Sequence, residues 1–278
     1  MIKSQPQKFI KNAIFISYTG LKDFLNCPRS YYLKNIYRNP ENGFKLQIAS
    51  PNLALGSTVH DGIKWFLEEV EKPTEKELID KYRNLWLRFR GKKGGFASLE
   101  DEANFGRRGL SILENFYKNW QILGKSAPRL TFPKYNLFED VVLMGNFDYI
   151  KVKEDGTLFV IDFKSGANDE KDPLQLYIYA ILAEANLERD VTSAGYWYLD
   201  RDDEPREIVL DLLGEKLERL TEKGKEIKDA LAKNEWVCIR QDQGGCRDCN
   251  DYQALLDGKG EFQFSDYRYK KDVYYLKK

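Results

Sequence analysis

The chain has 278 residues, 42% hydrophobic and 32% charged, so it can bury a sizeable core beneath a well-solvated surface. The chain has 44 lysines and arginines and 44 aspartates and glutamates, so its net charge is zero. A neutral chain gives no overall sign of nucleic-acid binding, although a zero sum can hide local basic patches. No apolar run is long enough to cross a bilayer, and the N-terminus lacks the long apolar stretch of a secretory signal. We therefore expect a cytoplasmic protein without membrane contact.

The first half of the chain is predicted to be mostly helical. Ser17 can cap a short helix that begins at residue 18, and Pro28 suits the first turn of the next helix. Residues 39–52 are predicted to form a loop. A helix over 53–71 should follow, because apolar residues recur there at helical spacing. These residues are Leu55, Val59, Ile63, Phe66 and Val70.

Two further helices complete this half. Thr74 and Glu77 form a capping box in front of the helix over 77–90. A Gly- and Lys-rich break follows, and Ser98 opens a long helix that ends near Trp120.

From residue 129 the hydrophobic period changes to two, which indicates strands. Strands are predicted over 136–144, 145–153, 157–164, 191–200 and 205–212, and helices over 172–186 and 214–234. Strands followed by a helix and more strands are typical of a mixed α/β sheet.

The stretch GNFDYIKVKEDGTLFVIDFKSG, residues 145–166, predicts a hairpin whose turn contains Gly156. Glycine readily adopts the left-handed conformation that a three-residue hairpin loop requires. If the hairpin is centred on Asp155, Asp148 lies opposite Asp162 on one face of the sheet. Lys164 follows Asp162 by two residues and so shares that face. The hairpin therefore brings two carboxylates and an ammonium group together.

Two adjacent carboxylates repel each other unless a cation lies between them. Hard oxygen ligands suit Mg²⁺ or Mn²⁺, which can activate a water and stabilise a phosphoryl oxygen. Lys164 can orient that water or offset charge in the transition state. The alternative is a structural Asp–Lys pair on a water-facing hairpin. The nearly all-apolar run before Asp162 instead favours a central strand covered on both faces.

Asp148 and the D-F-K of residues 162–164 resemble the signature of the PD-(D/E)XK nuclease superfamily. Phe147 replaces the signature's proline, but GNFD matches the G-x-x-D form of the RecB-like branch. Three other stretches resemble that branch: SYTGLKDFLNCPRSYYLKNIYR, LGSTVHDGI and LQLYIYA. Order and spacing agree from about residue 16 to residue 250.

This resemblance implies a restriction-endonuclease-like fold, in which helices flank a mixed central sheet. It implies one nuclease domain over residues 1–278, with a helical insertion or cover at 53–128 and the core sheet at 129–210. Cys27 and residues 238–249 would form a segment that binds a cluster.

The resemblance also assigns roles to residues outside the hairpin. His60, the one histidine of the chain, becomes a metal ligand together with Asp148 and Asp162, and Glu139 takes an acidic position near that metal. Gln175 and Tyr179 share a helix face, where they would hold the active site and touch the nucleic-acid backbone. Structural roles are the alternatives: a half-buried histidine, a surface glutamate, and a helix packed on the sheet.

The chain contains four cysteines: Cys27, Cys238, Cys246 and Cys249. In a reducing compartment, cysteines at short spacing favour metal binding over disulfide formation. One N-terminal and three C-terminal cysteines resemble the iron–sulfur subset of RecB-like nucleases, in which a [4Fe–4S] cluster ties the chain ends together. Here the third cysteine precedes the C-x-x-C pair, whereas the family usually places it afterwards. Zn²⁺ or free thiols are the alternatives.

Two basic segments are candidate nucleic-acid contacts. Arg88, Arg90, Lys92 and Lys93 surround flexible glycines, and the tail over 267–278 interleaves cations with tyrosines. Cations neutralise phosphates and aromatic rings stack on unpaired bases, so both segments can line a single-strand path. A solvated loop and a frayed terminus are the alternatives.

The combined hypothesis is a Mg²⁺- or Mn²⁺-dependent DNA nuclease, with an exonuclease on single strands or duplex ends favoured over an endonuclease. Relatives of this type act in recombination, repair, phage replication and CRISPR adaptation, which suggests a protein partner in such a complex. The competing hypothesis is a non-catalytic nucleic-acid-binding protein, or an assembly factor whose nuclease stays dormant until a partner binds.

Overall fold

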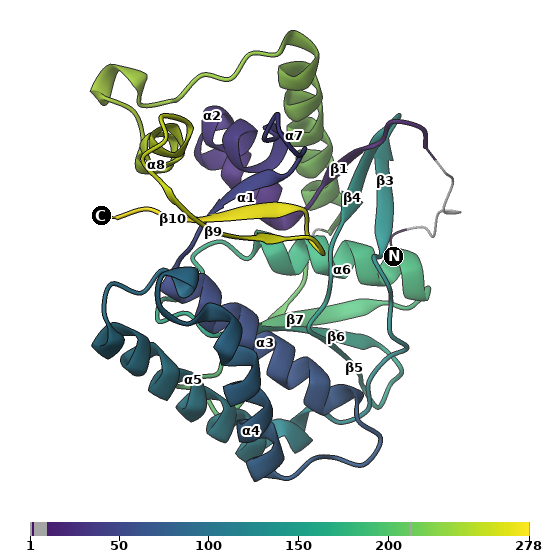
Figure 1. Cartoon of the computed structure of the whole chain (residues 1–278). Coiled ribbons are helices and arrows are strands. Elements are labelled where there is room, and N and C mark those ends of the chain that lie inside the picture. The colour runs from purple at the N-terminus through teal and green to yellow at the C-terminus, as the bar shows by residue number, and fades with distance from the viewer. Residues whose placement is uncertain (1, 3–9, 212, 278) are drawn as a thin grey trace. The chain divides into compact units, whose positions relative to one another are not determined.

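The computed structural model describes residues 2, 10–211 and 213–277 (Figure 1). Residues 1, 3–9, 212 and 278 lie outside the described residues, and the expected lack of a secretory signal falls in part on the first of these. The chain forms two compact units, described separately below. Unit 1 comprises Met1–Leu21 and Asn119–Glu235, and unit 2 comprises Lys22–Lys118 and Trp236–Lys278. No helix in the described ranges combines the length and apolarity that a bilayer crossing requires.

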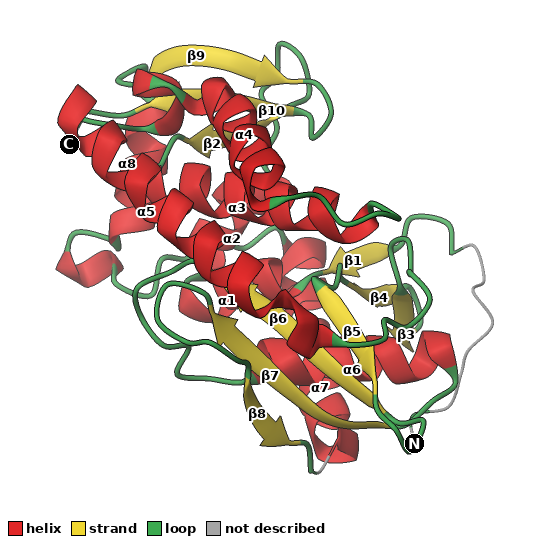
Figure 2. Cartoon of the chain, turned by 90° about the horizontal axis from the view of Figure 1, so that it is seen from below, coloured by secondary structure: helices red, strands yellow, loops and turns green. Residues whose placement is uncertain are grey.

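Unit 1 contains the predicted mixed sheet, which is confirmed. Its four strands lie in sequence order, β5 (Tyr149–Val152), β6 (Leu158–Lys164), β7 (Val191–Tyr198) and β8 (Arg206–Val209) (Figure 2). The two central strands are parallel, and each outer strand pairs antiparallel with its neighbour. The predicted crossover helix, α6 (Leu174–Leu187), connects the central pair and packs on the sheet.

The central strand β6 is buried from Leu158 to Phe163, as its apolar run predicts. Leu158 and Val160 pack into one cluster with Leu176 and Ala180 of α6. Because most of α6 is also buried, β6 and α6 hold any polar side chain they carry in a fixed, largely dry position.

A second sheet of unit 1 corrects one prediction. Residues 136–144, predicted as one strand, form parts of two antiparallel strands, β3 (Lys134–Phe138) and β4 (Val141–Met144). The chain reverses at Glu139, whose φ is 41°, and Lys228 of α7 (Leu213–Lys233) pairs with the carboxylates of Glu139 and Asp140. β1 (Ile14–Ile16), which was not predicted, pairs parallel with β4. A three-residue strand leaves almost no period in the sequence.

The helices of the first half of the chain are confirmed in position. They are α1 (Tyr18–Asn26), α2 (Pro28–Tyr31) with a π-helical turn (Tyr32–Ile36), α3 (Pro51–Glu68), α4 (Glu75–Trp86) and α5 (Leu99–Asn119). Phe66 of α3 packs edge-on against Phe116 of α5 at a centroid distance of 5.5 Å. Val70, predicted to be on the apolar stripe, is 97% exposed because α3 ends at Glu68.

The predicted helix starts are also confirmed. The Oγ atoms of Ser17 and Ser98 each accept a hydrogen bond from the backbone N–H three residues later. Thr74 and Glu77 form the complete capping box, and Pro28 occupies the first turn of α2. The serine and threonine oxygens accept hydrogen bonds from N–H groups that would otherwise lack a partner at the helix start. Proline has no N–H group and so leaves none unpaired.

Unit 2 also contains a sheet. It includes part of residues 39–52, which the sequence predicts to be a loop, and part of the tail, for which a frayed terminus is the alternative. β10 (Lys271–Tyr275) lies between β9 (Glu261–Asp266), to which it is antiparallel, and β2 (Lys45–Ile48), to which it is parallel. The loop prediction over 39–52 is therefore wrong at β2, and the described part of the tail is not frayed. Strands from opposite ends of the chain stabilise each other by pairing, which no local pattern reveals.

Candidate functional site

The β5–β6 hairpin has the predicted register. Gly156 adopts a φ of 83°, and Oδ1 of Asp155 accepts a hydrogen bond from the N–H of Thr157, which closes the turn. Tyr149 pairs with Ile161 at the end of the ladder, and every pair is symmetric about Asp155. Asp148 and Asp162 are the next residues outward from this last pair.

The two carboxylates differ in their surroundings. Asp162 is only 3% exposed, within a strand that is otherwise apolar, and Asp148 is half-buried just before β5. Oδ2 of Asp148 accepts a hydrogen bond of 2.8 Å from the backbone N–H of Phe163, which neighbours Asp162. This bond ties the first carboxylate to the strand that carries the second, so both lie at the same end of the hairpin.

Lys164 and Gln175 complete a polar network around Asp162. Nζ of Lys164 lies 2.8 Å from Oδ2 of Asp162 and donates a 2.7 Å hydrogen bond to Oε1 of Gln175. Nε2 of Gln175 donates to Oδ1 of Asp162 at 2.8 Å. The predicted shared face of Asp162 and Lys164 is confirmed, and one buried amide of α6 contacts both charged groups.

Two tyrosines border this network. Nε2 of Gln175 also lies 3.1 Å from the hydroxyl of Tyr179, and Nζ of Lys164 lies 4.8 Å from the ring centroid of Tyr196. Burial raises the pKa of both phenols, and the negative charge of Asp162 raises each pKa further. Both hydroxyls therefore stay protonated at neutral pH. Sequence reasoning missed Tyr196, which pairs with Asp162 across the parallel strands β6 and β7.

The donor set fits a divalent cation. Two carboxylates lie at one end of a hairpin, one of them buried, and carboxylate oxygens are the ligands that Mg²⁺ and Mn²⁺ prefer. A lysine and a protonated tyrosine adjoin them, so cationic and neutral donors are ready for an anionic substrate.

A model of the PD-(D/E)XK nuclease superfamily matches residues 16–253, most of the chain. The chain belongs to the PD-(D/E)XK nuclease superfamily. Members of this superfamily are in general metal-dependent nucleases, so family membership implies that the substrate is a nucleic acid. A search of curated proteins returned no match.

Two other residues that the sequence predicts near a metal, His60 and Glu139, lie in different elements. His60 lies half-buried in α3 of unit 2, and its role as a ligand stays a prediction. Glu139 lies in the β3–β4 turn, where its side chain is 71% exposed and Oε2 is 2.6 Å from Nζ of Lys228. Its place near the metal also stays a prediction.

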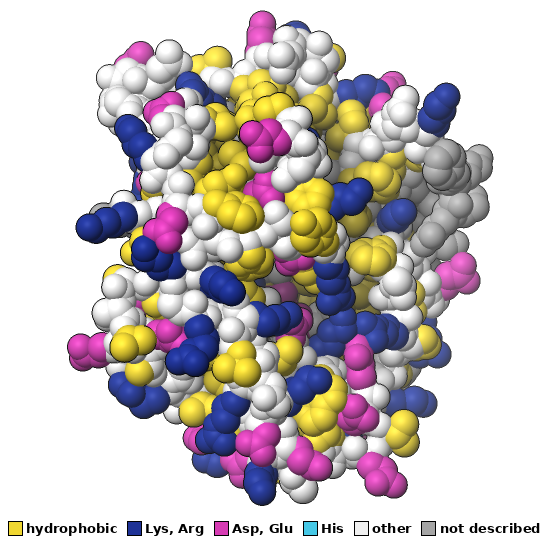
Figure 3. Space-filling view, viewed as in Figure 1, with side chains coloured by type: hydrophobic (Ala, Val, Ile, Leu, Met, Phe, Trp, Pro, Cys, Tyr) yellow, Lys and Arg dark blue, Asp and Glu magenta, His cyan; other side chains and the backbone are white. Residues whose placement is uncertain are grey.

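The predicted basic segment of the PD-(D/E)XK chain is folded and mostly ion-paired. Arg88 pairs with Asp61 at 2.7 Å, Arg90 with Glu102 at 3.5 Å, and Lys92 with Glu261 at 2.6 Å. Lys93 lies with Lys92 in a 3₁₀ turn (Gly91–Gly94). Figure 3 likewise shows lysine and arginine side chains interspersed with acidic ones over the visible face. Nucleic-acid binding by these four residues stays a prediction.

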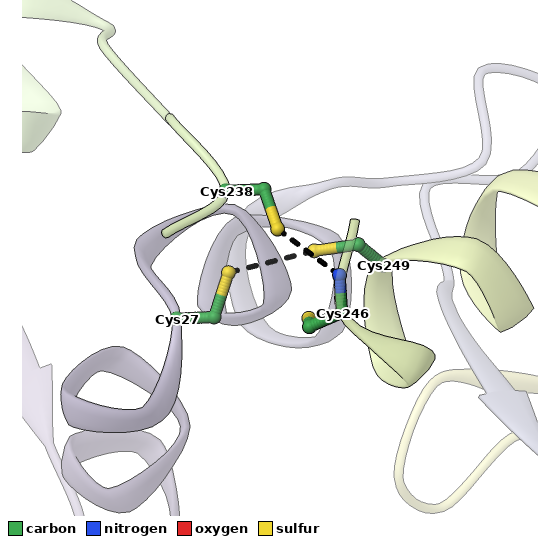
Figure 4. Close-up of side chains that lie close together, drawn as sticks. All are labelled: Cys27, Cys238, Cys246 and Cys249. Carbon is green, nitrogen blue, oxygen red and sulfur yellow. Dashed lines mark hydrogen bonds between the residues drawn. The ribbon is translucent and has the colours of Figure 1, made fainter. Parts of the chain in front are cut away.

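The four cysteines of unit 2 form a second candidate centre (Figure 4). Cys27 precedes α2, Cys238 follows α7, and Cys246 and Cys249 lie at the start of α8 (Arg247–Leu256). Their four Sγ atoms all lie within 4.8 Å of one another, and those of Cys27 and Cys249 are 3.5 Å apart. None forms a disulfide, so four thiol groups converge on one point, which can bind a metal or a cluster.

The thiols differ in acidity. Backbone hydrogen bonds, from Arg240 first and also from Cys246, lower the pKa of Cys238 to about 7. Burial raises the pKa of Cys246 and Cys249. A cation would offset the cost of burying several thiolates together, and metal binding would release protons from them.

Proposed function

We propose that the protein is a Mg²⁺- or Mn²⁺-dependent deoxyribonuclease, and an exonuclease that acts on single strands or duplex ends. The observation that carries the proposal is the hydrogen bond that holds Asp148 to the backbone of Phe163, next to the Asp162–Lys164 pair, in a member of a nuclease superfamily. His60 as a third ligand, Glu139 near the metal and residues 53–128 as a cover over the strand belong to the same proposal.

Each polar group has a role in this mechanism. Asp148 and Asp162 would hold the cation, which when bound would supply Lewis acidity toward a phosphoryl oxygen. Lys164, held by Asp162 and Gln175, orients the attacking water and offsets charge that develops on the phosphate. Gln175 positions both charged groups. Tyr179, protonated and bonded to Gln175, can donate to a backbone phosphate oxygen.

The test is cleavage of end-labelled single- and double-stranded DNA with Mn²⁺ by the anaerobically purified protein. The Asp162→Ala variant should lose at least about a thousandfold in rate, because it lacks a metal ligand. Glu154→Ala removes an exposed acidic side chain from the turn of the same hairpin and should leave the rate unchanged.

The product ladder separates exonuclease from endonuclease. Release of short end products supports the exonuclease proposal, whereas internal cuts in a circular strand contradict it. If the folded wild-type protein cleaves nothing, the autonomous-nuclease proposal is wrong, and the binding-only or partner-activated hypothesis takes its place. The settings in which such a partner would act include recombination, repair, phage replication and CRISPR adaptation.

We further propose that the four cysteines bind a metal centre. The resemblance to the iron–sulfur branch favours [4Fe–4S]. The spacing of the sulfur atoms favours a single Zn²⁺, because Zn–S bonds of about 2.3 Å place tetrahedral ligands about 3.8 Å apart. The four irons of a cluster would hold the thiolates farther apart than the observed limit of 4.8 Å. Metal analysis and the visible spectrum of anaerobic protein separate the two: iron with broad visible absorption, or zinc without colour.

A further inference from the structure

The β2–β10–β9 sheet of unit 2 brings two lysines together. Lys45 and Lys271 occupy paired positions of the parallel strands β2 and β10, so their side chains lie on the same face. Both are half-buried. Burial lowers the pKa of both ammonium groups, and the charges of Arg38 and Lys271 lower that of Lys45 further. Like charges in paired positions are unfavourable, so this arrangement calls for an anionic partner.

Nearby side chains neutralise this charge only in part. Among the described residues the ammonium of Lys45 forms no ion pair, and Nζ of Lys271 donates to the neutral Oε1 of Gln47 at 2.8 Å. The nearby Asp23 is 3.0 Å from Nζ of a different lysine, Lys34. Asp266, which pairs with Lys271 across β9 and β10, and Asp23 offset part of the positive charge at Lys45 and Lys271.

Arg38 adds a third cation in a fixed orientation. Its Nη1 donates to the carbonyl oxygens of Asn35, Ile36 and Tyr37 at 2.9, 2.8 and 2.8 Å, where the π-helical turn ends. These bonds leave the other guanidinium nitrogens as donors.

Two exposed tyrosines adjoin the cations at the tip of the β9–β10 hairpin. Tyr267 is 79% exposed and Tyr269 is 58% exposed, so both rings present a large part of their surface to solvent. Nζ of Lys271 lies 6.0 Å from the ring centroid of Tyr269. Tyr267 packs edge-on against Phe44, the residue that precedes Lys45, at 5.6 Å.

We propose that this corner of the sheet, formed by Arg38, Lys45, Lys271, Tyr267 and Tyr269, binds single-stranded nucleic acid. The cations contact successive backbone phosphates, and Tyr269 stacks on an unpaired base. Exposed aromatic faces next to phosphate-binding cations suit unpaired bases better than a duplex, whose bases are already stacked. The inference rests on the proposed function and deepens it, because it names a second contact with the strand.

The test measures binding without cleavage. Fluorescence anisotropy with labelled oligothymidylate, in a chelator and across a salt series, gives Kd and its salt dependence. The double variant Lys45→Gln/Lys271→Gln should reduce the slope of log Kd against log salt by ~0.7 for each phosphate that its side chains no longer neutralise. Tyr269→Ala should weaken binding about fivefold or more and leave the slope unchanged.

Arg83→Gln is the matched control, since Arg83 of the same unit is 63% exposed and pairs with Asp80 on α4. Circular dichroism and thermal unfolding verify that each variant is folded. Because Tyr269 is exposed, the Tyr269→Ala substitution should leave the sheet intact. The proposal is overturned if Tyr269→Ala binds like the wild type, or if Arg83→Gln weakens binding as much as the double variant. Competition by inorganic phosphate with no effect of Tyr269→Ala would identify a simple anion site instead.

Because the assay contains no divalent cation, it is independent of catalysis. Wild-type protein that binds through this corner but cleaves nothing would contradict the proposed nuclease and leave the strand-binding inference standing. If the wild type cleaves DNA but all variants bind the oligonucleotide as the wild type does, the strand-binding inference is wrong and the proposed nuclease stands.

Discussion

Gln175 connects the charged groups of the candidate active site. A single amide donates to Asp162 and accepts from Lys164, so it determines how far apart these two side chains lie. It comes from α6, whose remaining buried side chains are almost all apolar. A buried polar side chain persists in such a helix only when its hydrogen bonds are satisfied, as they are here.

Gln175→Leu should therefore raise the Mn²⁺ concentration needed for half-maximal cleavage and lower kcat, each about 10- to 100-fold, as is typical when a residue that orients metal ligands is removed. A Mn²⁺ titration of the cleavage rate measures both effects. Gln121→Leu, at an exposed glutamine, is the control. A variant with lower thermal stability but an unchanged Mn²⁺ dependence would show that Gln175 has only a structural role.

At the scale of the element, the β2–β10–β9 sheet is built around a buried carboxylate. Asp272 of β10 is 1% exposed, and its oxygens accept hydrogen bonds from Asn39 and Asn42 at 2.9 Å and from Ser265 at 2.6 Å. Burial alone would raise the pKa of Asp272, but these three donors outweigh it and hold the pKa below its ordinary value. Asp272 thus attaches the loop before β2 and the strand β9 to the central strand.

A carboxyl whose pKa is lowered on folding stabilises the folded state above its unfolded pKa, and this stabilisation is lost as the pH falls through the folded pKa. At pH 7 we expect Asp272→Asn to lower the free energy of unfolding by about 2 kcal/mol, since the new amide cannot accept all three bonds. The difference from the wild type should shrink below a pH of about 4.

Denaturant unfolding between pH 7 and pH 3 measures this difference. Asp257→Asn, at an exposed aspartate of the same unit, should show neither effect. A difference that stays constant across the range would mean that the pKa of Asp272 is not lowered in the folded state.

At the scale of the whole molecule, the cysteine centre joins distant parts of the chain. Cys27 lies near the N-terminus, and the other three cysteines lie beyond residue 237. A metal that binds all four thiolates stabilises the folded state, because the unfolded chain holds no preformed site. Closing so long a loop is also costly in entropy, and a metal bound by the four thiolates would offset part of that cost.

Cys246→Ser should thus lower both the bound metal per chain and the thermal unfolding midpoint by several degrees, in line with a loss of about 2 kcal/mol or more. Elemental analysis and calorimetry measure the two quantities on the same sample. Wild-type protein stripped of metal should unfold at the same midpoint as the variant and recover on reconstitution. Equal midpoints for metal-loaded and stripped wild type would show that the centre does not stabilise the fold.

The amount that could be predicted differs between the two units. In unit 1 the hairpin register followed from a local rule, because a turn centred on Asp155 determines every pair up to Tyr149 and Ile161, the residues next to Asp148 and Asp162. Tyr196 escaped prediction because β7 pairs with β6 in parallel, and no short turn determines the register of a parallel pair. The β3–β4 turn was missed because its reversal at Glu139 uses a residue type that rarely adopts a positive φ.

The sequence by itself determined the helices and their caps, the central strand and the position of Asp148 and Asp162 at one end of the hairpin, and its motifs indicated the superfamily. These features depend on residues a few positions apart, where periodicity and turn chemistry act directly. Only the tertiary structure decided the β2–β10–β9 sheet, the place of Tyr196, the gathering of Cys27 with the late cysteines and the pairing of Lys45 with Lys271. Their energies come from contacts between distant segments, which exist only once the chain has folded.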